Sequence, residues 1–380
     1  MRNLADTLSR LKHRASAAHP ASSRLEPVAI MGPNPGGLKA HQHVPTDLDR
    51  RPALVVVLHG CTQTAAAYDA GSGWSSLADR NGFVVLYPEQ QAANNPGRCF
   101  NWYVTSDVER GRGEAASIRS AIETVVLQHD IDRSRIFVTG LSAGGAMATA
   151  MLATYPEIFA GGAVIAGLPY GAAASVPEAF DRMRGHGLAG AAASTTAVLA
   201  ASDHAGPWPP ISIWHGDADQ TVAAVNADAL VAQWVGVHAL KAEPDEVRRV
   251  AGHIHRLWRG AGGKVVVEDY RIAGMGHGVP IETHGDQPCG AAGPYFLEAG
   301  LSATRTLVTR WKLAKPDRPD PAPSPEPLER QPREHETSAQ GGGPREVTPS
   351  VTQVETVTHP AAGSIQGVIE DALRRAGLMR

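Results

Sequence analysis

A tight turn between a strand-like and a helix-like segment makes residues 135–152 the strongest constraint on the fold. Residues 136–139 are β-branched or aromatic, and residues 146–152 are mostly strong helix formers. Between them stands Gly-x-Ser-x-Gly, with Ser142 at its centre. Because glycines on both sides permit a very sharp bend, this pattern would project the serine hydroxyl above a sheet. Ser142 is therefore a candidate nucleophile, and an ordinary tight turn is the alternative.

Short apolar runs alternate with helix-like segments along most of the chain. The expected strands are at 53–58, 83–87, 136–139, 162–166, 211–214 and 264–272, and the expected helices at 74–80, 115–128, 146–152 and 223–233. Fully apolar runs are typical of parallel strands that are buried on both faces. The alternation predicts a doubly wound, mostly parallel α/β sheet with helices on both faces. The alanine-rich residues 171–206 suggest helices over the sheet, where a lid would lie.

Composition divides the chain into four parts. With 43% hydrophobic residues, the chain has enough apolar material for one large core, which we assign to residues 25–314. Residues 1–24 have the leucine spacing of an amphipathic helix, and residues 315–363 have the proline-rich, weakly hydrophobic composition of a disordered linker. Residues 364–380 predict a short amphipathic helix that docks on its own chain or mediates self-association.

Charge and cysteine content exclude several classes of protein. A formal net charge of -3 gives no electrostatic reason to expect a nucleic-acid partner. We see no apolar stretch of about 20 residues and no secretory signal, so we expect a cytoplasmic protein without a transmembrane segment. The three cysteines, Cys61, Cys99 and Cys289, lack the paired spacing of a zinc site. We therefore expect no metal and no cofactor.

A serine hydroxyl becomes a strong nucleophile only when a base accepts its proton and a carboxylate orients that base. Asp219 and His277 each follow a predicted strand, which gives the order Ser, Asp, His that is typical of α/β-hydrolases. Asp217 competes with Asp219 for the acid role. His277 stands between two glycines, which would let a loop bring its ring close to Ser142.

Backbone amides that follow two predicted strands are candidate donors to an oxyanion. One is Ala143, the residue after the nucleophile, and the other is Cys61 or Gly60 in the loop after residues 53–58. His59 in the same loop is expected to have a structural role.

Seven short motifs occur together between about residues 25 and 312. They are His59-Gly-Cys-Thr-Gln, Cys99-Phe-Asn-Trp-Tyr103, Gly140-Leu-Ser-Ala-Gly-Gly-Ala-Met, Tyr155-Pro156, Gly167-Leu-Pro-Tyr-Gly171, His215-Gly-Asp-Ala-Asp219 and Gly276-His277-Gly. Together they resemble the PHB-type esterases, a family of poly(3-hydroxybutyrate) depolymerases with related feruloyl and acetylxylan esterases. Since that family includes many secreted enzymes, the resemblance makes an extracellular location the alternative to the cytoplasm.

The resemblance implies an α/β-hydrolase fold and roles for individual residues. It implies a triad of Ser142, Asp219 and His277, with the Cys61 amide as an oxyanion donor. It also suggests a Cys61–Cys99 disulfide that would fix the oxyanion loop, with two buried thiols as the alternative. Three aromatic residues are candidates for an acyl-binding cleft, although buried aromatics more often belong to a core. They are Trp102, Tyr103 and Trp208.

These observations lead to three hypotheses of function. The first is a serine esterase that hydrolyses poly(3-hydroxybutyrate) esters or oligomers through an acyl-enzyme. The second is a feruloyl or acetylxylan esterase that uses the same triad. The third is a non-catalytic granule-binding or scaffolding protein on a hydrolase fold.

Overall fold

The computed structural model describes residues 24–284 and 288–315. The expected N-terminal amphipathic segment (1–24), linker (315–363) and C-terminal helix (364–380) lie, apart from Arg24 and Lys315, outside the described residues.

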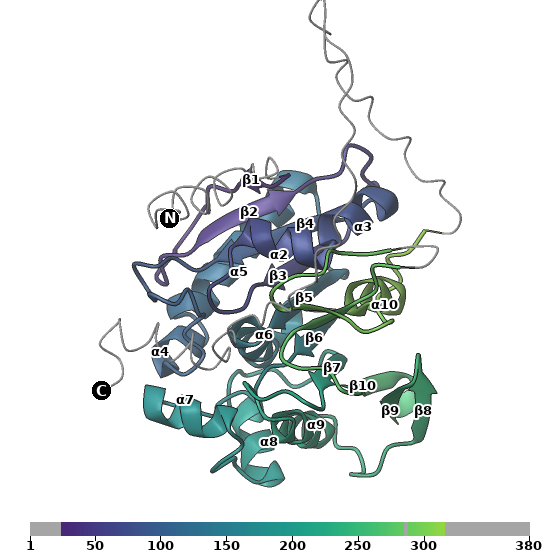
Figure 1. The fold of residues 1–380 in the computed structure, drawn as a ribbon. Helices are drawn as coiled ribbons and strands as arrows, with labels where there is room; N and C mark the ends of the chain where they lie inside the picture. Colours follow the sequence, from purple (N-terminus) through teal and green to yellow (C-terminus); the bar gives the residue numbers. More distant parts are fainter. Residues whose placement is uncertain (1–23, 285–287, 316–380) are drawn as a thin grey trace, which may run out of the picture.

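A 10-stranded sheet forms the centre of the molecule, in the order β1-β2-β4-β3-β5-β6-β7-β10-β9-β8 (Figure 1). The strands are, in that order, Glu26–Pro27, Lys39–His43, Val84–Glu89, Leu54–Leu58, Ile136–Leu141, Gly161–Ile165, Ile211–Gly216, Val265–Ile272, His253–Arg259 and Glu246–Val250. All pairs from β4 to β10 are parallel, and the pairs at both margins are antiparallel. The predicted mostly parallel sheet is confirmed.

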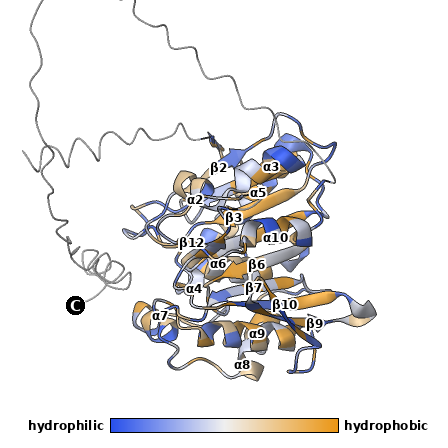
Figure 2. Cartoon of the chain, turned by 45° about the vertical axis from the view of Figure 1, so that its right-hand side comes forward, coloured by the Kyte–Doolittle hydropathy of each residue, from blue (hydrophilic) through white to orange (hydrophobic). Residues whose placement is uncertain are grey.

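Helices cover both faces of the sheet, because alternate side chains of each buried strand point to opposite sides. Leu54, Val56 and Leu58 join one hydrophobic cluster, with residues of α5, α6 and α9, whereas Val55 and Val57 join another, with residues of α2, α3 and α10. The helices are α2 Ala65–Ser72, α3 Trp74–Asn81, α4 Thr105–Val108, α5 Gly113–His129, α6 Ala143–Thr154, α7 Val176–Met183, α8 Ala191–Leu199, α9 Val225–Val237 and α10 Ala303–Arg310. Figure 2 shows hydrophobic residues concentrated on the central strands.

Several strands have no counterpart in the sequence expectations. β1, β2, β8 and β9 were not predicted, because each lies towards an edge of the sheet and lacks a continuous apolar run. The short strands β11 Val279–Ile281 and β12 Phe296–Glu298 form a separate pair. The strand expected at 83–87 is β4, but it runs two residues further, to Glu89, and Pro88 lies opposite Ala40 of β2.

The alanine-rich segment contains two helices, as its composition suggested. α7 and α8 lie between β6 and β7 in the chain, and Figure 1 shows α7 on the same side of the molecule as α8 and α9. In the described ranges, no helix is both long and apolar enough to cross a lipid bilayer.

Candidate active site

Ser142 lies in a sharp turn between β5 and α6. Its backbone has a φ of 57° and a ψ of -118°, a conformation that a non-glycine residue adopts only when its surroundings impose it. A Cβ atom on Gly140 would lie 2.2 Å from the Gly144 carbonyl oxygen, and one on Gly144 would lie 2.3 Å from the Leu58 carbonyl oxygen. Both glycines are therefore required by close backbone contacts. The Ser142 amide also donates to the carbonyl of Ile165 in β6, at 2.9 Å.

Asp219 and His277 meet at the carboxyl ends of β7 and β10. His277 Nδ1 donates to Asp219 Oδ2 at 2.7 Å, and both side chains are buried. The other carboxylate oxygen, Oδ1, accepts from the amides of Thr221 (2.8 Å) and Val222 (2.9 Å). With one oxygen tied to the backbone, the carboxylate holds the imidazole in a fixed orientation.

A second histidine stands beside the same carboxylate. His215 Nε2 lies 3.4 Å from Asp219 Oδ2 and donates to the Val222 carbonyl at 2.8 Å, while its Nδ1 is buried and has no hydrogen-bond partner in the part of the chain that the structure describes. Burial alone would raise the pKa of Asp219, but the hydrogen bonds and charges of His215 and His277 outweigh it, and this pKa lies well below its usual range. Asp219 is therefore ionised at neutral pH.

Asp217, the competing acid, has a different environment. It is exposed, and its Oδ1 accepts from the Gly274 amide at 2.6 Å, in the loop between β10 and His277. The structure brings Asp219 to His277 and leaves Asp217 to hold that loop.

The two expected oxyanion donors lie on the loop after β3 and at the start of α6. The Gly60 amide donates to Gln63 Oε1 at 2.8 Å, so it is already engaged. The amides of Cys61 and Ala143 have no hydrogen-bond partner within residues 24–284 and 288–315. The sequence left two candidates for the second donor, the amides of Gly60 and Cys61. Among the described residues, only the Cys61 amide of these two lacks a partner.

A disulfide joins Cys61 to Cys99. It connects the loop after β3 to the loop that carries Trp102 and Tyr103, and the Thr62 amide reinforces this link by donating to the Gly97 carbonyl at 2.7 Å. The loop that carries the expected oxyanion donor Cys61 is thereby attached to the loop whose aromatic residues line the cavity beside Ser142.

A small apolar cavity of about 30 Å³ adjoins Ser142, which is 6% exposed. Its lining residues are Cys61, Cys99, Trp102, Tyr103, Ser142, Ala143, Leu168, Val176, Ala179, Phe180, Met183 and Val222. Four of these come from α7, so the segment in which a lid was expected lines the cavity beside Ser142. In this structure the cavity has room for about one water molecule.

Of the three aromatic residues expected in the cleft, the structure brings two to it. Trp102 and Tyr103 line the cavity and contact each other edge to face, with ring centroids 5.6 Å apart. Trp208 does not: it precedes β7 and packs against Trp234 of α9 at 6.4 Å. The expectation for Trp208 fails because the residue lies at the amino end of a strand, whereas Ser142 lies at a carboxyl end.

A buried polar network behind the cavity was not foreseen. Glu114, 1% exposed, accepts from the Asn101 amide at 2.8 Å and from Gln90 Nε2. Gln90 Nε2 also donates to the Cys99 carbonyl at 3.1 Å, and Asn95 Oδ1 accepts from the Cys99 amide at 3.3 Å. Glu114 resembles an ordinary first-turn acid of a helix, so no signal in the sequence distinguished it.

Burial raises the pKa of Glu114 to about 8, with the nearby charge of Asp107 adding to the effect. His59 also belongs to this region. Its Nε2 accepts from the Gln90 amide at 3.1 Å, which agrees with the expected structural role.

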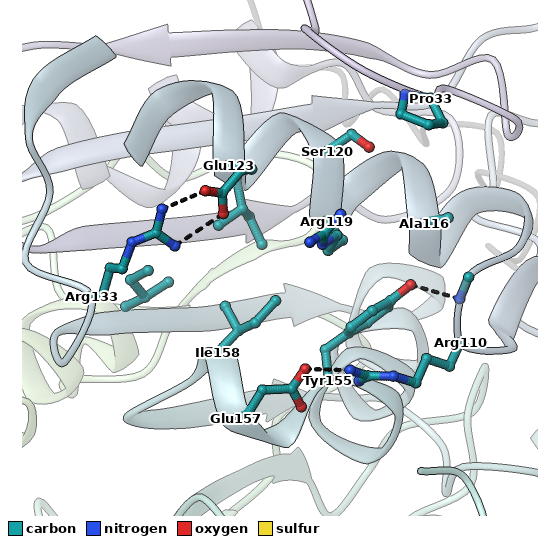
Figure 3. Close-up of a pocket in the computed structure, with 13 residues that line it drawn as sticks. Pro33, Arg110, Ala116, Arg119, Ser120, Glu123, Arg133, Tyr155, Glu157 and Ile158 are labelled. Carbon is teal, nitrogen blue, oxygen red and sulfur yellow. Dashed lines mark hydrogen bonds and ion pairs between the residues drawn. The ribbon is translucent and has the colours of Figure 1, made fainter. Parts of the chain in front are cut away.

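A larger pocket of about 500 Å³ lies between α5 and the short helix η1, Pro156–Ile158 (Figure 3). Arg110 pairs with Glu157 and lies 4.7 Å from the centre of the Tyr155 ring, whose hydroxyl accepts from the Gly111 amide at 2.7 Å. No candidate catalytic residue lines this pocket. The Tyr155-Pro156 motif thus joins the end of α6 to the loop before α5. Within the described ranges, no group of three or more metal-binding side chains could hold a metal ion.

Several known proteins are similar to this chain in sequence or in fold. The family described as Esterase PHB depolymerase matches residues 41–256. Poly(3-hydroxyalkanoate) depolymerase C of Paucimonas lemoignei is 46% identical over 282 residues, which cover 74% of this chain and 68% of the relative. Acetylxylan esterase A of Aspergillus oryzae is 32% identical over 288 residues, covering 73% of this chain and 91% of the relative. The solved structure of acetyl xylan esterase from Aspergillus awamori, 26% identical, has a TM-score of 0.62 and covers 67% of this chain and 93% of its own.

These similarities confirm the resemblance that the motifs indicated, and with it the α/β-hydrolase fold. They support an enzyme that acts on an ester substrate, and they give no support to a non-catalytic scaffold. This chain is a carboxylic ester hydrolase that belongs to the Esterase PHB depolymerase family.

Proposed function

We propose that this esterase hydrolyses poly(3-hydroxyalkanoate) esters or oligomers, with Ser142 as nucleophile, His277 as base and Asp219 as the orienting acid. The observation that carries the proposal is the apolar cavity against Ser142 in a chain 46% identical to a protein named poly(3-hydroxyalkanoate) depolymerase C. The cavity walls other than Ser142 offer hydrocarbon, aromatic and disulfide surface, which suits a branched aliphatic acyl unit.

In the first half of the reaction, His277 Nε2 accepts the Ser142 hydroxyl proton as Oγ bonds to the ester carbonyl carbon. The amides of Cys61 and Ala143 donate to the resulting oxyanion. The carbon–oxygen bond to the alcohol then breaks, and His277 returns the proton to the leaving oxygen. In the second half, water attacks the acyl-enzyme in the same way and releases the acid and Ser142.

The Asp219 carboxylate stabilises the imidazolium that forms in both halves. Because hydrogen bonds hold the pKa of Asp219 well below its usual range, the carboxylate stays ionised while the histidine gains a proton. Its fixed geometry keeps Nδ1 protonated, which leaves Nε2 as the base.

Entry of the acyl unit requires α7 to move, since a cavity of about 30 Å³ is smaller than a hydroxybutyryl group. The C-terminal end of α7 is anchored: the Met183 carbonyl accepts from the Ala223 amide at 2.7 Å, and the Arg182 carbonyl accepts from Asn226 Nδ2 at 2.9 Å. Val176, Phe180 and Met183 are only half-buried. α7 therefore acts as a lid that opens from its N-terminal end.

The second candidate is a feruloyl or acetylxylan esterase. Acetylxylan esterase relatives match over 91% of their own length, and an acetyl group is also small and apolar. A comparison of kcat/KM for hydroxybutyrate trimer, methyl ferulate and acetylated xylan separates the candidates. We expect the trimer to give the highest value, and a higher value for either carbohydrate ester would transfer the assignment to the second candidate.

The nucleophile is tested independently of the substrate. Ser142→Ala should abolish hydrolysis of short-chain p-nitrophenyl esters without changing the melting temperature, because the acyl-enzyme needs that oxygen. Wild-type turnover by this variant would refute the role of Ser142.

The disulfide also bears on the cellular location. Disulfides persist in oxidising compartments, so the Cys61–Cys99 bond favours the extracellular alternative over the expected cytoplasm. The net charge of -3 supports a protein without a nucleic-acid partner. Self-association through residues 364–380 remains a prediction outside the described residues.

A further inference from the structure

β8 ends the 10-stranded sheet and, within the described residues, pairs only with β9. Figure 1 shows the β8–β9 hairpin extending beyond the helices that cover the rest of the sheet. Val247, the second residue of β8, is 62% exposed, and Ile254 of β9 is 39% exposed. An uncovered strand edge with exposed apolar side chains is a surface suited to strand pairing.

The backbone of β8 presents free hydrogen-bonding groups on its outer side. The two-residue turn Ala251–Gly252, with φ values of 49° and 84°, closes on the pair Val250–His253. Hydrogen-bonded and non-hydrogen-bonded pairs then alternate along the hairpin. The amides and carbonyls of Val247 and Arg249 consequently point away from β9.

The charges around Val247 are self-complementary for an antiparallel pair of two copies. With Val247 opposite Val247, Glu246 faces Arg248 of the second copy and Arg248 faces its Glu246. If the pairing shifts to the next register in which the same outward amides and carbonyls can still bond, Glu246 lies opposite Glu246 or Arg248 lies opposite Arg248. Like charges then repel. An edge protected against its own copy would carry charges of one sign, whereas this edge is acidic on one side of Val247 and basic on the other.

Glu246, Arg248 and Arg249 already have partners on their own chain. Glu246 pairs with Arg259 at 2.9 Å and, through Arg248 Nη1, with Arg248 at 3.7 Å. Arg248 Nε donates to His255 Nδ1 at 3.2 Å, and Arg249 Nη1 donates to the Gly252 carbonyl at 3.0 Å. The ion pairs of Glu246 are exposed to solvent and contribute little, so their exchange for partners on a second copy costs little. Arg248 can keep its Nε bond to His255 during this exchange, because its Nη atoms make the ion pairs.

We propose that β8 pairs with β8 of a second copy around a two-fold axis, so that two sheets join into one. Val247 and Ile254 lie on the same face of the hairpin, because Val247 is opposite Arg256 and Arg249 is opposite Ile254. Val247 of the second copy would cover this exposed apolar surface. Since Ser142 lies at the carboxyl end of β5, four positions along the sheet from β9, the pairing leaves the active site open.

Sedimentation equilibrium of the full chain over a concentration series tests the pairing. We expect a reversible monomer–dimer equilibrium. Glu246→Arg and Arg248→Glu each place like charges at two symmetry-related pairs, so each should raise the dimer Kd about tenfold or more. The double variant Glu246→Arg/Arg248→Glu restores opposite charges and should recover the wild-type Kd.

A matched control uses the exposed ion pair of Glu109 and Arg112, 2.9 Å apart and remote from β8. Glu109→Arg and Arg112→Glu make the same changes in net charge and should leave the dimer Kd unchanged. A wild-type chain that stays monomeric at every concentration, or a dimer whose Kd the two β8 variants do not change, would overturn the proposal.

Hydrogen exchange provides a readout that does not depend on substitutions. Protection of the Val247 and Arg249 amides should rise with protein concentration, because only the dimer gives them partners. Equal exchange at low and high concentration would exclude this strand as the interface. Neither outcome bears on ester hydrolysis, whose test is separate.

Discussion

At the residue scale, two aspartates that lie two positions apart in the chain compete for the role of the acid. Asp217 and Asp219 both follow β7, yet the carboxylate of Asp219 meets a histidine 58 residues away. It was foreseeable that a serine, an aspartate and a histidine that each follow a strand would lie near one another, because the carboxyl ends of parallel strands lie at one edge of a sheet. Which aspartate turns towards His277 depends on the loop after β7, whose path is set by contacts with the segment after β10.

This difference predicts unequal effects of two amide substitutions. Asp219→Asn should lower kcat about 10⁴-fold, because it removes the charge that stabilises the imidazolium and disturbs the tautomer. Asp217→Asn should change kcat less than about tenfold, since Asp217 only holds the Gly274 amide. Steady-state kinetics on a p-nitrophenyl ester checks both, and the opposite ranking would give the acid role to Asp217.

Glu114 predicts a pH-dependent stability. Its folded pKa, raised to about 8 by burial, lies above the unfolded value of 4.5. The folded state therefore binds the proton more tightly than the unfolded state does. The contribution of this proton to the free energy of unfolding is complete below pH 4.5 and is lost as pH rises towards 8. Each pKa unit corresponds to about 1.4 kcal/mol.

Glu114→Gln should abolish this pH dependence, because glutamine does not ionise. Measured by urea unfolding, the stability of the wild type relative to Glu114→Gln should fall between pH 5 and pH 8. If the variant loses one hydrogen bond, the difference in stability between wild type and variant changes by the same amount at both pH values, so its pH dependence still reports the ionisation of Glu114. A difference that stays constant with pH would mean that Glu114 is already ionised at pH 5.

At the scale of elements, two loops that are far apart in the chain are joined beside Ser142. The loop after β3 carries Cys61, and the loop before α4 carries Cys99, Trp102 and Tyr103. The disulfide joins them across a sequence separation of 38 residues, and the Glu114 network supports the second loop from behind. The position of the proposed oxyanion donor, the Cys61 amide, is therefore tied to the loop that forms one wall of the cavity beside Ser142.

Thiol titration and kinetics test this link. The unreduced, denatured protein should show one free thiol, that of Cys289, and the folded protein none, since burial raises the pKa of Cys289 to about 11. Three free thiols after denaturation would exclude the disulfide.

Removal of the disulfide should affect stability and catalysis separately. Cys61→Ser/Cys99→Ser keeps the amide of residue 61 but releases its loop, so kcat should fall about 10²-fold. The loss of stability should be about 4 kcal/mol for a loop of this length. If kcat is unchanged while stability falls, the disulfide has a structural role only.

At the scale of the whole molecule, the proposed nucleophile lies in a small cavity that residues of α7, the proposed lid, help to line. Ser142 is 6% exposed and its cavity holds about 30 Å³, so a substrate chain must be free enough to pass beneath α7. A soluble oligomer meets this condition, whereas a chain held in a crystal lattice does not.

We therefore expect hydroxybutyrate oligomers to be hydrolysed much faster than crystalline polymer film of equal ester content. Release of hydroxybutyrate over time measures both rates, and amorphous polymer should give an intermediate rate. Comparable rates on film and oligomer would show that α7 does not limit access.

The sequence by itself determined the features that depend on neighbouring residues. The turn at Ser142, the alternation of strands and helices, and the motifs that indicated the family all follow from local backbone preferences and short spacings. Their order along the chain was enough to predict the sheet and the candidates Ser142, Asp219 and His277.

Only the tertiary structure decided which distant groups meet. It placed Asp219 rather than Asp217 against His277, Trp208 before the amino end of β7 rather than beside Ser142, and Glu114 behind the disulfide-linked loop. It also revealed β8 as an open edge, because polar strands at a sheet margin carry no apolar run to mark them. These arrangements arise from the twist of the sheet and the packing of segments tens of residues apart, which no local pattern encodes.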